Sequence, residues 1–220
     1  MRMKRKPWAD ELYEQNQNFY KKFPYDIKGN WHNFFGNDKP IELEIGSGKG
    51  GFITQLAKIH PEKNFIALEI NEMALAYLLR KQFELKLPNL FLIIGDAKEV
   101  DQYFEKQEIN NIYLNFSDPW PKSRHEKRRL TSPGFLDRYQ KILNKNGKLT
   151  FKTDNQSLFI YSIKTIANKS EAIIDKLTFD LHNSEFVKEN VETEYEIKFS
   201  KKGAPIYMLE AHFKKGDKDE

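Results

Sequence analysis

Short apolar runs alternate with longer amphipathic segments along the chain from residue 40 onward. The apolar runs, which predict β-strands, span 41–45, 64–70, 89–94, 111–116 and 147–152. The segments between them carry apolar residues at helical spacing and predict helices over roughly 50–60, 71–86, 98–106, 133–143 and 155–169. Repeated strand-then-helix units are typical of a mostly parallel sheet with helices on both faces. The pattern therefore predicts an α/β, doubly wound fold.

The pattern changes after residue 170. Two stretches, 177–183 and 205–213, alternate apolar and polar positions on either side of a long polar insertion. We expect late strands there that form an antiparallel edge of the sheet.

Residues 1–39 differ from the rest of the chain, because they are polar, aromatic-rich and interrupted by Pro and Gly. We expect a basic, partly helical N-terminal extension that lies outside the core. Its tip carries the cations Arg2, Lys4, Arg5 and Lys6. Residues 40–213 then form the main domain, and residues 214–220 are a charged tail that we expect to fray.

Composition and charge narrow the classes of function. The 36 Lys and Arg residues against 32 Asp and Glu give a net charge of +4, so a basic binding surface must come from clustering. The chain has no cysteine, which excludes disulfides, thiolate metal sites and cysteine nucleophiles. It has no signal-peptide apolar region and no run near the ~18 apolar residues of a membrane span. We therefore expect a cytoplasmic protein without a membrane segment.

A glycine-rich turn, GSGKGG, follows the first predicted strand directly. Glycines there let the backbone turn sharply and approach a ligand closely, at the N-terminus of the next helix. Gly46, Gly48 and Gly50 fit the spacing of methyltransferases, whereas Gly46, Gly48 and Gly51 fit that of dinucleotide binders. The glycines alone leave both cofactor classes open.

Four acids decide between these cofactors, one near the carboxyl end of each of four successive strands: Glu44, Glu69, Asp96 and Asp118. Ligands of open α/β sheets bind at that edge. A carboxylate at Glu44 would oppose a pyrophosphate but suits the ammonium and sulfonium of S-adenosylmethionine. Glu69 is placed to accept both ribose hydroxyls, and Asp96 could also simply begin a helix. The acids favour S-adenosylmethionine over NAD.

A family resemblance extends over about 40–213. The motifs EIGSGKG, ALE, GDA, NFSDPWPK, RHEKRRL, FKTDN and TEYE resemble, in this order, those of the bacterial tRNA (guanine-N7-)-methyltransferases. The resemblance implies a seven-stranded methyltransferase sheet, S-adenosylmethionine as donor, and tRNA as partner, methylated at N7 of a guanosine in the variable loop. We expect no metal, because the histidines have no ligand spacing, and either a monomer or a homodimer, since the sequence does not reveal the oligomeric state. The resemblance also assigns cofactor binding to Glu44, Gly46, Gly48, Glu69, Asp96 and Asp118, with Asp118 in the catalytic role.

Guanine N7 carries a lone pair and no proton at neutral pH, so we expect Asp118 to position the base and match its charge, not to accept a proton. The guanine N1–H and N2–H donors suit Asp118, Asp154 and Glu196 as acceptors. The full set expected to bind substrate is Lys122, Asp154, Thr193, Glu194, Tyr195 and Glu196. The set expected to hold the RNA backbone is Arg124, His125, Lys127, Arg128 and Arg129. Trp120 either stacks on a base or packs in the core.

Two other functions stay open on the residues alone. SDPW resembles the Asp-Pro-Pro-aromatic motif of N6-adenine and amide-nitrogen methyltransferases, with Trp120 in the place of the second proline. A non-catalytic RNA-binding protein would keep the basic cluster and lose the cofactor acids, which are all present here.

Overall fold

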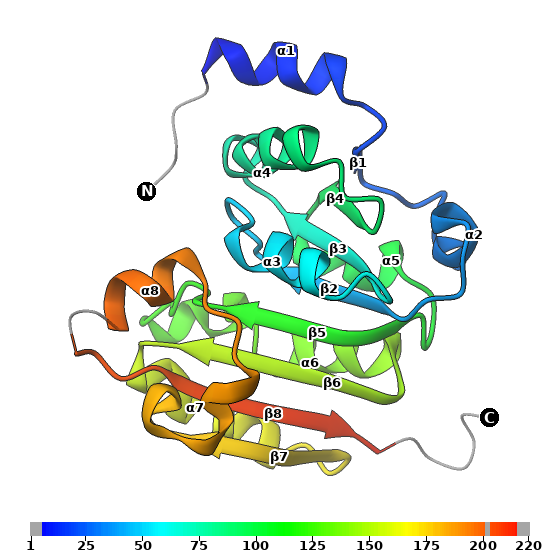
Figure 1. Cartoon of the computed structure of the whole chain (residues 1–220). Helices are drawn as coiled ribbons and strands as arrows, with labels where there is room; N and C mark the ends of the chain where they lie inside the picture. Colours follow the sequence, from blue (N-terminus) through cyan, green and yellow to red (C-terminus); the bar gives the residue numbers. More distant parts are fainter. Residues whose placement is uncertain (1–5, 201–202, 215–220) are drawn as a thin grey trace.

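The computed structural model describes residues 6–200 and 203–214, so the predicted basic tip at Arg2, Lys4 and Arg5 and the tail at 215–220 lie outside the described residues. A single twisted sheet crosses the molecule, and helices cover both of its faces (Figure 1). In the described part of the chain, every helix is too short or too polar to span a bilayer.

The sheet has eight strands in the order β1-β4-β3-β2-β5-β6-β8-β7. All pairs are parallel except those that β8 makes with β6 and β7, which confirms the doubly wound fold and its antiparallel edge. The strands are β1 (Tyr20–Lys22), β2 (Ile41–Ile45), β3 (Asn64–Glu69), β4 (Leu90–Ile94), β5 (Ile109–Asn115), β6 (Leu143–Thr153), β7 (Ala172–Thr178) and β8 (Tyr207–Phe213). The count exceeds the seven expected strands because β1 comes from the N-terminal extension.

Helices pack on both faces of this sheet, and each face has its own hydrophobic cluster of buried side chains. One face carries α1 (Pro7–Gln15), α3 (Gly51–Ile59) and α4 (Glu72–Leu85). The other carries α2 (Trp31–Phe35), α5 (Val100–Tyr103), α6 (Pro133–Ile142) and α7 (Gln156–Ala167). The remaining helices are α8 (Glu194–Ser200) and the 3-10 helices η1 (Ala97–Glu99), η2 (Ser123–Arg128), η3 (Leu181–Asn183) and η4 (Glu185–Glu189).

The expectation that residues 1–39 lie outside the core is wrong for the described part of that segment. Trp31 is fully buried, and its indole N–H donates to the carbonyl of Tyr103 at 2.9 Å. The Tyr13 hydroxyl donates to the carbonyl of Glu72 at 2.7 Å. β1 pairs with the outer edge of β4, where unpaired backbone groups would otherwise face solvent. The aromatic residues of the extension supply the apolar area that holds it in place.

The first of the two predicted late strands, 177–183, lies earlier in the chain than expected, at Ala172–Thr178. β7 ends at Thr178, and the residues after it form η3 instead of the strand expected at 177–183. Leu181 accounts for the change, because its buried side chain packs with Ile206 and Met208 over one face of the sheet. The insertion that follows ends in α8, which lies at the arrowhead end of β5 and β6 (Figure 1).

Candidate functional site

The glycine turn after β2 adopts a conformation that other residues rarely take. Gly46, Gly48 and Gly50 have φ values of 77°, 55° and 72°. A Cβ at Gly50 would lie 2.2 Å from Cδ1 of Leu78 on α4. Glycine is therefore required at Gly50 both by backbone conformation and by packing.

A cavity of about 470 Å³ lies at the carboxyl ends of β2, β3, β4 and β5. Three of the four predicted acids line it: Glu69, the last residue of β3, Asp96, which follows β4, and Asp118, which follows β5. The other lining residues used below are Gly46, Lys98, Asn115, Phe116, Trp120 and Arg128. The structure thus brings together at one edge the residues that the strand pattern predicted there.

Two of the cavity acids also organise the backbone around them. Glu69 accepts from the backbone N–H of Gly48 at 2.9 Å and from that of Asn71 at 2.8 Å, which ties the glycine turn to the start of α4. Asp96 accepts from the N–H of Lys98 at 2.9 Å and so caps η1. The prediction that Asp96 could begin a helix is therefore confirmed. Asp96 also lines the cavity.

Glu44 lies at the end of β2, almost fully buried, in a strand whose neighbours Leu43 and Ile45 are buried as expected. One carboxylate oxygen accepts from Nδ2 of Asn115 at 2.9 Å, and the other makes no hydrogen bond of normal geometry among the described residues. Burial raises the pKa of Glu44 to about 8, although Asn115 and then Lys152 oppose that shift. The backbone N–H of Ile53 also lies close enough to lower the pKa of this carboxyl group. Unpartnered buried oxygens also belong to Ser47 and Asn115.

These orphaned atoms fit one end of S-adenosylmethionine. A buried unpaired carboxylate and a free amide oxygen are acceptors for an ammonium group, and a free hydroxyl is a donor for a carboxylate. Glu44, Asn115 and Ser47 offer this donor and acceptor set. The arrangement is unfavourable for a pyrophosphate, which would meet the buried carboxylate.

The loop after β5 is strained where it borders the cavity. Phe116 and Trp120 have φ values of 52° and 40°, which L-residues with bulky side chains seldom adopt. The carbonyl of Trp120 accepts from the Arg129 guanidinium at 3.1 Å and 3.3 Å. The guanidinium of Arg128 lies 4.8 Å from the centre of the indole ring. Trp120 is half-buried and lines the cavity, so packing in the core does not describe its position.

The predicted RNA-binding cations gather on η2 and its flanks. Lys122, Arg124 and Lys127 are exposed, and within the described ranges none of them forms an ion pair with an acid. Arg128 reaches the cavity wall, and the His125 ring packs edge-on against Trp120. A free basic cluster therefore borders the cavity on the side of Asp118.

The TEYE segment does two different things. Thr193 and Glu196 form a capping box at the start of α8, because the Glu196 N–H donates to the Thr193 hydroxyl at 2.9 Å and Oε2 of Glu196 accepts from the Thr193 N–H at 3.3 Å. Both side chains are buried. Tyr195 is exposed, and its hydroxyl donates to Asp154 at 3.2 Å, while Glu194 pairs with Lys81.

The placement of Glu196 bears on its predicted role. Its side chain is fully buried, and both of its oxygens already accept hydrogen bonds within the protein. Asp154 and Tyr195 are more accessible than Glu196. Contact of Thr193 or Glu196 with substrate stays a prediction, and this arrangement gives neither a free acceptor at the surface.

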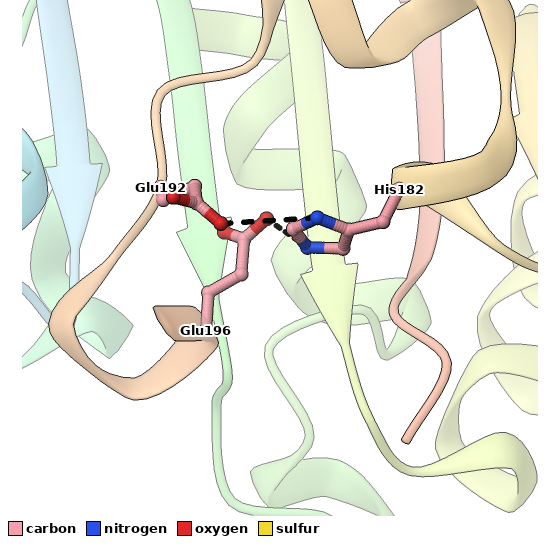
Figure 2. Close-up of side chains that lie close together, drawn as sticks. All are labelled: His182, Glu192 and Glu196. Atoms are coloured by element: carbon pink, nitrogen blue, oxygen red, sulfur yellow. Dashed lines mark ion pairs between the residues drawn. The ribbon is translucent and has the colours of Figure 1, made fainter. Parts of the chain in front are cut away.

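Glu196 and two neighbouring side chains, His182 and Glu192, are of the residue types that can bind a metal ion. Figure 2 shows His182, Glu192 and Glu196 converging, with ligand atoms all within 4.8 Å of one another. The Nε2 atom of His182 lies 3.1 Å from Oε1 of Glu196. The other Glu196 oxygen, Oε2, is 2.8 Å from the ammonium of Lys152. The ammonium of Lys152 thus already neutralises Glu196, one of the three side chains of this cluster.

Comparison with known proteins places this site in a family. A family model described as a putative methyltransferase matches residues 38–209. The tRNA (guanine-N(7)-)-methyltransferase of Latilactobacillus sakei is 51% identical over 214 residues, covering 97% of this chain and all of that protein. The corresponding protein of Listeria monocytogenes is 53% identical over 213 residues, covering 97% and 99%.

The chain belongs to the tRNA (guanine-N(7)-)-methyltransferase family. A solved structure described as an antibiotic-related methyltransferase superposes with a TM-score of 0.63 at 16% identity, covering 84% of this chain and 93% of that one. At that identity the likeness concerns the fold alone.

Sequence reasoning overlooked three residues of this family member's site. Asn115 supports Glu44, and its position in the NFSDPW motif at a strand end was an available signal. Lys152, in FKTDN, sits two residues before a predicted substrate acid. His182 gave no signal, because its proximity to Glu196 arises only from the packing of the insertion.

Proposed function

We propose that the protein transfers the methyl group of S-adenosylmethionine to N7 of a guanosine in tRNA. The observation that carries this is the buried, half-satisfied carboxylate of Glu44 beside a cavity lined by three further strand-end acids, with free cations at its border. The names of relatives about half identical over nearly the whole chain support the same reaction. We propose the variable loop as the target region and the cytoplasm as the location.

Methyl transfer to guanine N7 requires little proton transfer by the protein. S-adenosylmethionine supplies an electrophilic methyl group on a positively charged sulfur. Guanine N7 has a free lone pair, so the protein must orient the base and accommodate the positive charge that develops on it. Asp118 is exposed to the cavity and carries a charge of the required sign.

We assign the other substrate roles by position. Asp154 and Tyr195, joined by a hydrogen bond, face the N1–H and N2–H edge of the guanine. Lys122, Arg124, His125, Lys127, Arg128 and Arg129 hold the RNA backbone. Trp120 lines the cavity beside Arg128 and His125 of the basic cluster.

The test is incubation with unmodified tRNA transcript and methyl-labelled S-adenosylmethionine, followed by digestion and identification of the labelled nucleoside. Labelled 7-methylguanosine is the expected product, and label on adenosine would instead favour the N6-adenine alternative. Tight tRNA binding without label would favour a non-catalytic RNA-binding protein. Asp118→Ala should lower kcat/KM by at least about 100-fold, because a charge matched to the transition state is lost; full activity in that variant would remove the assigned role.

A further inference from the structure

Lys152 is a buried cation that none of the proposed catalytic or cofactor roles uses. It lies near the end of β6 and is 3% exposed. Its ammonium donates to Oε2 of Glu196 at 2.8 Å, to Oδ1 of Asn190 at 3.0 Å and to the carbonyl of Val191 at 2.9 Å. An ammonium has three hydrogens to donate, so Lys152 is fully satisfied.

All three acceptors lie on one segment, residues 190–196. This segment, which joins η4 to α8, has no regular structure before Glu194. Within it, Nδ2 of Asn190 donates to Oε1 of Glu196 at 2.7 Å, and the capping box joins Thr193 to Glu196. One sheet residue therefore fixes an otherwise irregular segment at three points.

The outward face of this segment carries a group assigned to the substrate. The ring of Tyr195 lies 4.8 Å from that of Phe116, which lines the cavity. Its hydroxyl reaches Asp154, which follows directly after the end of β6. The strand that supplies the anchor thus also leads into Asp154, and the anchored segment supplies Tyr195.

We propose that Lys152 is a positioning residue for the substrate: it holds residues 190–196 against β6 so that Tyr195 and Asp154 form one recognition surface at the cavity. The inference rests on the proposed methyl transfer to tRNA. It gives buried Glu196 the role of receiving this anchor in place of direct contact with guanine. A displacement of about 1 Å in a positioning element can lower a rate about 100-fold, so the anchor matters without touching substrate.

The deciding variant removes both charges, Lys152→Met with Glu196→Met. Lys152→Met alone leaves an uncompensated buried carboxylate and risks unfolding, whereas apolar replacement of a whole buried pair is often neutral for stability. The matched control is Lys148→Met with Glu210→Met. That pair joins the same two residue types at 2.9 Å, and Lys148 lies on the same strand as Lys152, farther from its carboxyl end.

Each protein is compared with wild type for thermal midpoint, cofactor affinity by calorimetry, tRNA affinity by fluorescence anisotropy, and kcat and KM for tRNA at saturating cofactor. We expect the Lys152/Glu196 double variant to fold and bind cofactor within about threefold of wild type. Its kcat/KM for tRNA should fall at least about tenfold, mainly through KM, and its tRNA affinity should weaken in parallel. The Lys148/Glu210 control should keep all five values.

Two results would overturn the proposal. One is a folded Lys152/Glu196 double variant whose tRNA affinity and KM match wild type. The other is an equal loss in the Lys148/Glu210 control, which would make the effect a general one of charge removal. Absence of 7-methylguanosine with the wild-type protein would instead contradict the proposed function, and the anisotropy comparison would still decide on the anchor.

Discussion

Two buried glutamates at the same end of the sheet have opposite surroundings. Glu44 has one free carboxylate oxygen and one hydrogen bond from a neutral amide. Glu196 has both oxygens engaged and a lysine ammonium at 2.8 Å. Buried charges persist in proteins when they are paired, as Glu196 is here, whereas burial without an ionic partner raises the pKa of Glu44 instead. The difference teaches that burial alone does not identify a ligand site, whereas an unfilled hydrogen-bonding position next to a cavity points to one.

The same difference divides the site into two working regions. The region around Glu44 has an unfilled hydrogen-bonding position, which the proposed cofactor would fill as the carboxyl group loses its proton. The region around Glu196 is neutralised by the protein itself and serves as scaffold. Four experiments test this division.

The largest effect is expected from Glu196→Ala. This substitution leaves Lys152 buried without its carboxylate, and breaking such a pair costs roughly 3–5 kcal/mol. Urea unfolding should show that loss in the free energy of unfolding. Glu44→Gln is the comparison, because it removes a carboxylate that has no ionic partner and should leave stability within about 1 kcal/mol of wild type or raise it. Equal losses in the two variants would contradict the division.

A smaller effect should appear in cofactor binding by Glu44→Gln. The substitution keeps the shape of the side chain but removes the charge that would meet the cofactor ammonium. A charged hydrogen bond contributes about 1.5–3 kcal/mol, which corresponds to roughly 10- to 100-fold in affinity. Calorimetric titration with S-adenosylmethionine measures it. An unchanged dissociation constant would show that the free oxygen of Glu44 faces something other than the cofactor.

The smallest effect concerns pH. With a pKa of about 8, Glu44 is mostly protonated in the free protein at pH 6 and pH 7. Cofactor binding should therefore release a proton, and affinity should rise about tenfold between these two pH values. Calorimetry in buffers of different ionisation enthalpy measures the released proton. Glu44→Gln should remove the dependence.

The same shift has a consequence of opposite sign for the stability of the free protein. Because the folded-state pKa of Glu44 is raised, its contribution is fully present below the unfolded value near 4.5 and is lost as pH rises through about 8. Unfolding of wild type and Glu44→Gln across pH 5 to 8 would reveal this term. An equal pH dependence in both proteins would contradict it.

Much of the sheet and one half of the site follow from local sequence. The strands at Ile41–Ile45 and Asn64–Glu69 are short apolar runs, and their parallel pairing follows from the helix between them. Strand-end acids share one edge by the rule for parallel sheets, which is why Glu69, Asp96 and Asp118 line one cavity as expected.

The other half depends on contacts between distant segments. The contacts of Glu196 with Lys152 and His182 require the insertion to fold back over β6, and no spacing in the sequence encodes that. The capping box of Thr193 and Glu196 is predictable from the sequence, because Thr followed three residues later by Glu is a helix-start signature. The interpretation of TEYE as a substrate-binding motif left this capping box unpredicted.

The N-terminal extension was misjudged for a related reason. Polar and aromatic residues with Pro and Gly breakers resemble a solvated arm, yet Trp31 is fully buried. A three-residue strand such as Tyr20–Lys22 is too short to give a periodic signal. Its formation depends on the free edge of β4, a tertiary feature.

The pairing of β1 with β4 sets an order of events during synthesis. A ribosome makes Tyr20 long before Leu92, its partner in the sheet, so the first strand to emerge has to wait for its neighbour. Contacts so distant in sequence close late in folding. Until β1 pairs with β4, the edge of β4 is exposed and can pair with a strand of another protein. The N-terminal extension prevents such pairing once it has covered this edge.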